Sequence, residues 1–282
     1  MQPGRTQQQS PTAASPERCV LFFIAFIMTK RTLTISSFCL ALSMANAYAG
    51  WYECYNFKGS INTNSISLSI QVKDGYFGEK DKKDLNIIGV YKYDNQNSPI
   101  RLEGKFNFKD KKILLYEIIN KKYSAVFKFE FSENECNGIW TNLSTNKSMP
   151  LRLNYVSKLI DTLDENQSAD IEILQANSLP DFYFIGVYSK IAGENKAQMD
   201  KLKIIRKRDN LLFQILDFSK IESKTGNVRT IIYDNVEVTS AKTKQLSIWN
   251  DIGRMGGHLN VYFNSKAQIF KLNPNPIEDG AN

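Results

Sequence analysis

Alternation of apolar and polar residues between positions 99 and 153, with short polar turns between the runs, is the feature that most limits what this chain can fold into. In the segment 125–131, three phenylalanines stand at every second position and alternate with Lys128 and Glu130. Successive side chains of a β-strand point to opposite faces of a sheet, whereas a helix would scatter the three rings around its circumference. The segment therefore predicts a half-buried antiparallel strand in an all-β protein.

Short motifs in this region resemble a β-barrel domain that is common in secreted bacterial proteins. They follow the patterns x-L-x-G, L-x-E, A-x-F and G-x-W, at residues 102–104, 115–117, 125–127 and 138–140, and end with the run Pro-Leu-Arg-Leu at 150–153. The resemblance covers about residues 88–153. It implies a lipocalin-like barrel and brings no known activity with it.

The first 49 residues carry the features of an export signal. Residues 1–27 are polar and then apolar, and we interpret them as an upstream mis-start. From Met28 the chain has two basic residues, an apolar centre and the small residues of Ala47-Tyr48-Ala49, which predicts a signal peptide over 28–49. No later segment is apolar enough to span a membrane, so we expect a periplasmic or secreted protein.

Charge gives little guidance to the partner. Removal of residues 1–49 takes away four basic residues and one acidic residue, so the net charge falls from +7 to +4. A nucleic-acid partner is not expected outside the cytoplasm. With 42% hydrophobic and 12% aromatic residues, the chain can build one or two cores of ordinary size.

Two of the four cysteines, Cys54 and Cys136, remain after the signal peptide. In an oxidising compartment only one intramolecular pairing is open to them, and we predict a Cys54–Cys136 disulfide. Cys54 belongs to the first expected strand and Cys136 to the last hairpin of the first unit, and the first and last strands of a closed barrel are neighbours. The alternative is two buried free thiols.

The second half of the chain repeats features of the first. Residues 88–91 (IGVY) recur at 185–188 and residues 114–120 recur as a similar run at 211–217, both with an offset of 97. Residues 139–142 around Trp140 resemble those around Trp249 at an offset of 109. We interpret the pattern as duplication of a domain of about 100 residues.

The sequence therefore predicts two tandem antiparallel units, each a β-barrel or a β-sandwich. The expected boundaries are a first unit at 50–156, a linker at 157–180, a second unit at 181–276 and a tail at 277–282. The polar linker could hold one short helix over 158–163.

Candidate binding residues come from three places. The charged loop 73–84 is either a protruding binding loop or a solvated connection, and the strand 201–208 is either a docking edge for an acidic partner or a solvated edge. Gly253, Gly256 and Gly257 before His258 could hold a phosphate on their backbone N–H groups, or they could form a hairpin turn with His258 at the start of a strand. These segments contribute the candidates Lys80, Lys82, Lys83, Lys201, Lys203, Arg206, Arg208, Arg254 and His258.

The sequence contains no recognisable catalytic or metal-binding motif. One histidine excludes a site built on several imidazoles, and no G-x-S-x-G motif or visible carboxylate pair suggests a hydrolase. No motif implies a metal or another cofactor. Residues 52–54 resemble the first strand of periplasmic lysozyme inhibitors, although the S-G-x-x-Y loop of that family is absent.

The expected function is therefore non-catalytic binding of a protein in the periplasm. The most plausible partner is a toxin or lytic enzyme that attacks the cell envelope, so that the chain acts as an inhibitor or an immunity protein. A lipocalin-like carrier of a small apolar ligand and an envelope hydrolase with an unrecognised site are the alternatives.

Overall fold

The computed structural model describes residues 52–73, 85–160, 167–193, 197–219, 221, 224–225, 232–252, 255–273 and 277–278. The expected mis-start and signal peptide at 1–49 lie outside the described residues, as do nearly all of the loop 73–84 and most of the expected tail. The described part is all-β, with one turn of 3₁₀-helix and no α-helix.

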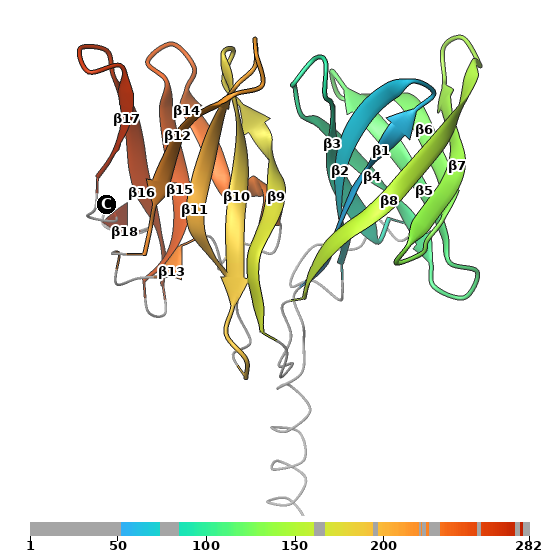
Figure 1. The fold of residues 1–282 in the computed structure, drawn as a ribbon, viewed down its shortest axis with the longest axis horizontal. Coiled ribbons are helices and arrows are strands. Elements are labelled where there is room, and N and C mark those ends of the chain that lie inside the picture. Colours follow the sequence, from blue (N-terminus) through green and yellow to red (C-terminus); the bar gives the residue numbers. More distant parts are fainter. Residues whose placement is uncertain are drawn as a thin grey trace, which may run out of the picture. The chain divides into compact units, whose positions relative to one another are not determined.

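Eight antiparallel strands form a closed barrel in the first half (Figure 1). Each strand pairs with the next along the chain, and β1 pairs with β8 to close the ring. This is the architecture that the family resemblance implies. The strands are β1 (Tyr52–Ile61), β2 (Asn64–Lys73), β3 (Ile87–Tyr93), β4 (Ile100–Asn107), β5 (Lys112–Ile119), β6 (Lys122–Glu130), β7 (Glu135–Asn142) and β8 (Ser148–Ile160).

Aromatic side chains fill the barrel interior. On β6, Phe127 and Phe129 are buried while Lys128 and Glu130 are exposed, as the alternation predicts. The ring of Phe127 packs edge-on against Tyr91, with 5.1 Å between ring centroids. Large rings from several strands thus occupy the space that a hollow carrier barrel would leave for a ligand.

Two glycines of the motifs at 102–104 and 138–140 stand where a side chain would clash with the neighbouring strand. A Cβ at Gly104 would lie 1.8 Å from the backbone oxygen of Leu114, and one at Gly138 would lie 2.2 Å from that of Lys128. Neighbouring strands approach too closely there for any side chain. The turn between β5 and β6 consists of Asn120 and Lys121, both with positive φ (51° and 62°), which is the geometry of a two-residue type I′ hairpin.

The second half forms two further sheets. A four-stranded sheet has the order β12-β11-β10-β9, and a six-stranded sheet has the order β13-β15-β16-β17, with β14 paired to β15 and β18 paired to β16. The first comprises β9 (Ser168–Ser178), β10 (Phe182–Lys190), β11 (Ala197–Arg206) and β12 (Leu212–Asp217). The second comprises β13 (Lys224–Thr225), β14 (Val236–Ser240), β15 (Gln245–Ile252), β16 (Met255–Asn264), β17 (Ile269–Leu272) and β18 (Ile277–Glu278), and the 3₁₀-turn η1 (Ile232–Asp234) precedes β14.

The two halves share one hydrophobic core. Outward-facing residues of the barrel wall, Cys54, Ile88, Val90 and Leu159, belong to the same buried cluster as Ile173 and the other core residues of the second half. The barrel interior forms a separate cluster. Burial of the outer barrel wall against the second half therefore joins the halves by the hydrophobic effect.

Polar contacts add to this junction. The Arg101 guanidinium on β4 donates from both terminal nitrogens to the carboxylate of Asp234 in η1, at 2.9 and 2.5 Å. The backbone N–H of Ile232 donates to Oε1 of the buried Gln71 at 3.0 Å. Both contacts fix η1 against the barrel, and a fork of two parallel hydrogen bonds also fixes its orientation.

The predicted disulfide is wrong. Cys54 and Cys136 are both buried free thiols, Cys54 in the cluster shared with the second half and Cys136 inside the barrel. They pair across the sheet with Leu159 and Leu153 of β8, which are six positions apart. That separation is about 20 Å along a strand, whereas a disulfide requires Cα atoms within about 7 Å.

The short helix expected over 158–163 is also wrong in its described part. Residues 158–160 are the end of β8, and 161–166 lie outside the described residues. Most of the expected linker is strand, because β8 continues to Ile160 and β9 begins at Ser168. Cross-strand pairing of β8 with β1 outweighs the local helical preference of this segment.

Candidate functional site

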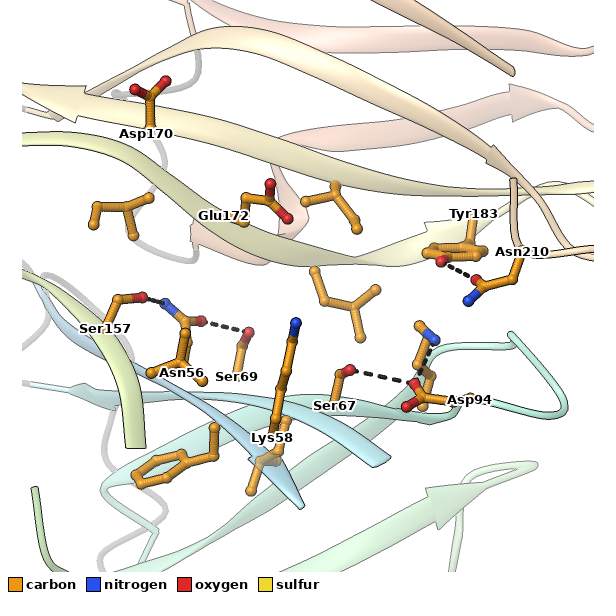
Figure 2. A pocket seen from close by; sticks show the side chains of 17 residues that line it. Asn56, Lys58, Ser67, Ser69, Asp94, Ser157, Asp170, Glu172, Tyr183 and Asn210 are labelled. Atoms are coloured by element: carbon orange, nitrogen blue, oxygen red, sulfur yellow. Dashed lines mark hydrogen bonds and ion pairs between the residues drawn. The ribbon is translucent and has the colours of Figure 1, made fainter. Parts of the chain in front are cut away.

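A cleft of about 610 Å³ lies between the outer wall of the barrel and the strands β9 and β10 (Figure 2). We call it the interface cleft. Its first wall is formed by β1, β2, β8 and the end of β3, and its second wall by β9, β10 and Asn210 from the β11–β12 turn. Its volume falls in the range of about 300–1,000 Å³ that is usual for ligand sites.

A row of short polar side chains crosses the barrel wall of the cleft. Ser69 Oγ donates to Asn56 Oδ1 at 2.7 Å, and Asn56 Nδ2 donates to Ser157 Oγ at 3.1 Å. The three residues are direct cross-strand neighbours on β2, β1 and β8. They face outward because Tyr55 and Phe57 on either side of Asn56 point into the barrel.

A β-bulge helps to place Ser157 in this row. The pairing of β1 with β8 shifts from Asn56–Ser157 to Phe57–Tyr155, which leaves Val156 without a cross-strand partner. A bulge adds one residue to one strand and so reverses the faces of the residues beyond it. Ser157 consequently joins the outer face, and Leu159 continues this face into the shared core.

A second row on the same wall carries charge. Lys58, Ser67 and Lys92 are cross-strand neighbours on β1, β2 and β3. Lys92 is 4% exposed, and its Nζ lies 2.8 Å from Asp94 Oδ1 and 3.0 Å from Asn97 Oδ1. The buried ammonium is therefore satisfied by an ion pair and an amide, as a buried charge must be.

The opposite wall is partly apolar. Leu174 of β9 and Ile185 of β10 line it beside the ring of Tyr183, which lies 4.9 Å below the Lys92 ammonium. The Tyr183 hydroxyl donates to Asn210 Oδ1 at 2.5 Å. Burial raises the pKa of Tyr183 to about 12, with help from the negative charges of Asp94 and Glu172. Tyr183 is thus a neutral hydrogen-bonding group at any physiological pH.

Two charges of opposite sign remain for a ligand. Glu172 is paired with Lys203 at 2.5 Å, and Asp94 is paired with Lys92. Lys58 and Asp170 line the cleft from opposite walls, and among the described residues neither has an ion-pair partner. Figure 2 shows the Lys58 side chain extending from the barrel wall into the cleft. The cleft therefore offers one cation, one anion, hydroxyl and amide groups, and an apolar patch.

The structure places the predicted binding residues as follows. Lys201 and Lys203 share a face of β11, and Lys203 pairs across the strands with the cleft residue Ile185 and forms an ion pair with the cleft residue Glu172. Arg206 and Arg208 both pair with Asp209, at 3.2 and 3.5 Å. The single carboxylate of Asp209 therefore offsets one of these two positive charges within the β11–β12 turn.

His258 lies away from the cleft. Its Nδ1 is 2.8 Å from Ser247 Oγ, and its ring packs edge-on against Trp249 with centroids 4.8 Å apart. It pairs across the strands with Trp249 and with Ile277, as expected for a residue within a sheet. Lys80, Lys82, Lys83 and Arg254 lie outside the described residues.

Sequence reasoning missed the central residues of the cleft. Asn56, Ser69 and Ser157 are single polar residues on three strands, and each alone is indistinguishable from an ordinary solvent-facing position. The one available signal was the alternation of 65–72, which predicts a polar face without saying what covers it.

No protein-family model, no curated protein and no solved structure matches this chain. In the part of the chain that is described, no helix is long and apolar enough to cross a membrane. The same residues contain no group of three or more His, Cys, Asp or Glu side chains placed to hold a metal ion.

Proposed function

We propose that this protein is a non-catalytic binding protein of the periplasm that holds a segment of a partner protein in the interface cleft. The partner would be a toxin or lytic enzyme that attacks the cell envelope, and binding would block it. The observation that carries the proposal is the cleft itself, with polar groups fixed on the barrel wall and both apolar and acidic groups on the opposite wall.

The chemistry of the cleft suits an extended polypeptide segment. A peptide backbone presents donors and acceptors in alternation, and the row Ser157–Asn56–Ser69 offers both. A partner side chain can pack on Leu174 and Ile185 while Lys58 and Asp170 pair with charges on the segment. Because strands and hydrogen bonds hold the lining residues, little order has to be gained on binding.

The carrier alternative has less support. An apolar ligand would require an apolar cavity, but large rings occupy the barrel interior and one wall of the interface cleft is polar and charged. No specific feature of the described cleft favours the hydrolase alternative.

We also propose that the two halves arose by duplication of one lipocalin-like unit. The two IGVY segments lie in β3 and β10, and each strand is the second of four antiparallel strands that pair in chain order, β2-β3-β4-β5 or β9-β10-β11-β12. This common order favours descent of both halves from one ancestral unit, later rearranged around β13 and η1. Equivalent positions for Trp140 and Trp249 remain a prediction.

The experiment uses the product of the gene next to this one. The full chain is expressed in a sensitive periplasm, the cells are challenged with that product, and the affinity of the purified pair is measured by calorimetry. Ser157→Trp fills the cleft, whereas Ser148→Trp places the same ring at an exposed position elsewhere on β8.

We expect protection and a complex with the wild-type chain and with Ser148→Trp, and loss of both with Ser157→Trp. Circular dichroism of each variant establishes that it has folded. No protection and no complex at micromolar concentration would end the proposal, and equal binding by the two variants would place the contact outside the cleft.

A further inference from the structure

A second hollow lies on the outer face of the barrel, over β4, β5 and β6. It has a volume of about 450 Å³ and contains Lys105, Lys112 and Lys128 around an apolar floor at Leu114, with Glu130 at its margin. We call it the lysine groove. Among the described residues that line it, three cations and one anion give the groove a positive charge, and none of these residues takes part in the interface cleft.

Cross-strand pairing places the lysines and the apolar residues of the groove in one row. Lys105, Leu114 and Lys128 are direct cross-strand neighbours on β4, β5 and β6, and Ile139 of β7 continues the same row with its side chain 50% exposed. Cation and apolar group thus alternate across four strands. Neighbouring strands lie about 4.8 Å apart, so the two lysines stand about 10 Å apart with Leu114 midway.

This spacing matches one face of an α-helix. Residues on one helix face recur after three or four positions, which is about 5 Å of rise, and again after seven positions, which is about 10.5 Å. A helix lying across the strands would bring an acidic residue to Lys105, an apolar residue to Leu114 and a second acidic residue to Lys128. A further apolar residue of the repeat would reach Ile139.

We propose that the lysine groove docks an acidic amphipathic helix of a protein partner. Opposite charge determines the approach and register of the helix, and burial of its apolar residues on Leu114 and Ile139 supplies the rest of the attraction. An anionic membrane lacks this alternation of charge with apolar groups at about 5 Å, so a helix is favoured over a lipid surface. The proposal does not depend on the interface cleft, because the groove lies on other strands.

The test uses a synthetic helix with Glu and Leu repeated at heptad spacing, and the full chain. A fluorescent label on the peptide reports binding by anisotropy at low and at moderate salt. The comparison peptide has the same composition in scrambled order. Lys105→Glu/Lys128→Glu reverses two charges of the groove, and Lys121→Glu/Lys122→Glu makes the same change at the β5–β6 turn outside it.

We expect the heptad peptide to bind the wild-type chain more tightly than the scrambled peptide, and more weakly as salt rises. Reversal at Lys105 and Lys128 should weaken binding by about tenfold or more, because it replaces two attractive charge pairs with two repulsive ones. Reversal at Lys121 and Lys122 should change it by less than about threefold. Leu114→Ser, which keeps every charge, should also weaken it.

Three results would overturn the proposal: equal binding of the two peptides, equal loss in the two charge-reversal variants, or binding only to vesicles of phosphatidylglycerol. The last would assign the groove to a membrane surface. The Ser157→Trp variant should still bind the peptide. The experiment therefore distinguishes failure of the proposal for the groove from failure of the proposal for the cleft.

Discussion

Cys54 and Cys136 lie on opposite faces of the barrel wall. Cys54 points outward into the core that the barrel shares with the second half, and Cys136 points inward, where its thiol donates to the backbone oxygen of Ser132 at 3.3 Å. Both thiols are fully buried, and each packs in a different cluster. Instead of forming the disulfide expected from the sequence, the two cysteines pack on opposite sides of one sheet.

The first prediction concerns these thiols. The purified chain should contain two thiols that become alkylated only after unfolding, and reductant should not change its melting temperature. Burial raises the pKa of Cys54 to about 12, so its thiolate is scarce and unreactive near neutral pH. A cross-linked peptide containing both cysteines, found by mapping without reductant, would contradict the structure.

The second prediction concerns the packed barrel. Phe127→Ala should lower the free energy of unfolding by about 3–5 kcal/mol, because it removes a fully buried ring from the interior. Lys128→Ala, one position along on the exposed face, should change it by less than about 0.5 kcal/mol. Denaturant unfolding of both variants provides the comparison, and similar losses in the two would argue against the assigned faces of β6.

The third prediction concerns the junction of the two halves. A double-mutant cycle of Arg101→Ala and Asp234→Ala should give a coupling free energy of about 1 kcal/mol, since the forked pair is partly exposed. Lys158 and Glu133 form a more exposed pair within the first half at 3.2 Å, and their cycle should give less. A coupling of zero for Arg101 and Asp234 would mean that η1 is not held in this way.

The fourth prediction concerns pH. The pKa of Tyr183 is raised from 10.0 to about 12 in the folded protein. A raised pKa means that the folded state keeps its proton longer, so this contribution to stability is complete below pH 10 and declines as the pH rises toward 12. Tyr183→Phe should therefore lose less stability than the wild type over that interval. Unfolding measured across the alkaline range tests it, and parallel curves for the two proteins would contradict it.

Much of the barrel could be predicted from sequence because strand formation there follows local alternation. The aromatic face of β6, the polar turns, Gly104 and Gly138 all depend on residues close together in the chain. The sheet order of the second half was not predictable in this way. In that half β13 pairs with β15 and β18 pairs with β16. The residue pattern within a strand does not show which other strand it will pair with.

The interface cleft escaped prediction for a related reason. Asn56 and Ser157 are 101 residues apart and become neighbours only when β1 pairs with β8. The pairing of Glu172 with Lys203 likewise depends on the order of β9, β10 and β11. The basic residues of 201–208 are evident in the sequence, but the ion pair of Arg206 with Asp209 and the proximity of Lys203 to a cleft are not.

Hydrogen exchange of the full chain, with and without the product of the neighbouring gene, tests the central claim most directly. If a partner segment occupies the interface cleft, protection on binding should concentrate in residues 54–69 of β1 and β2, at the end of β8 and in residues 170–185 of β9 and β10. The β7 strand should exchange as in the free protein. Protection confined to other strands, or no change in exchange at saturating partner, would contradict the account.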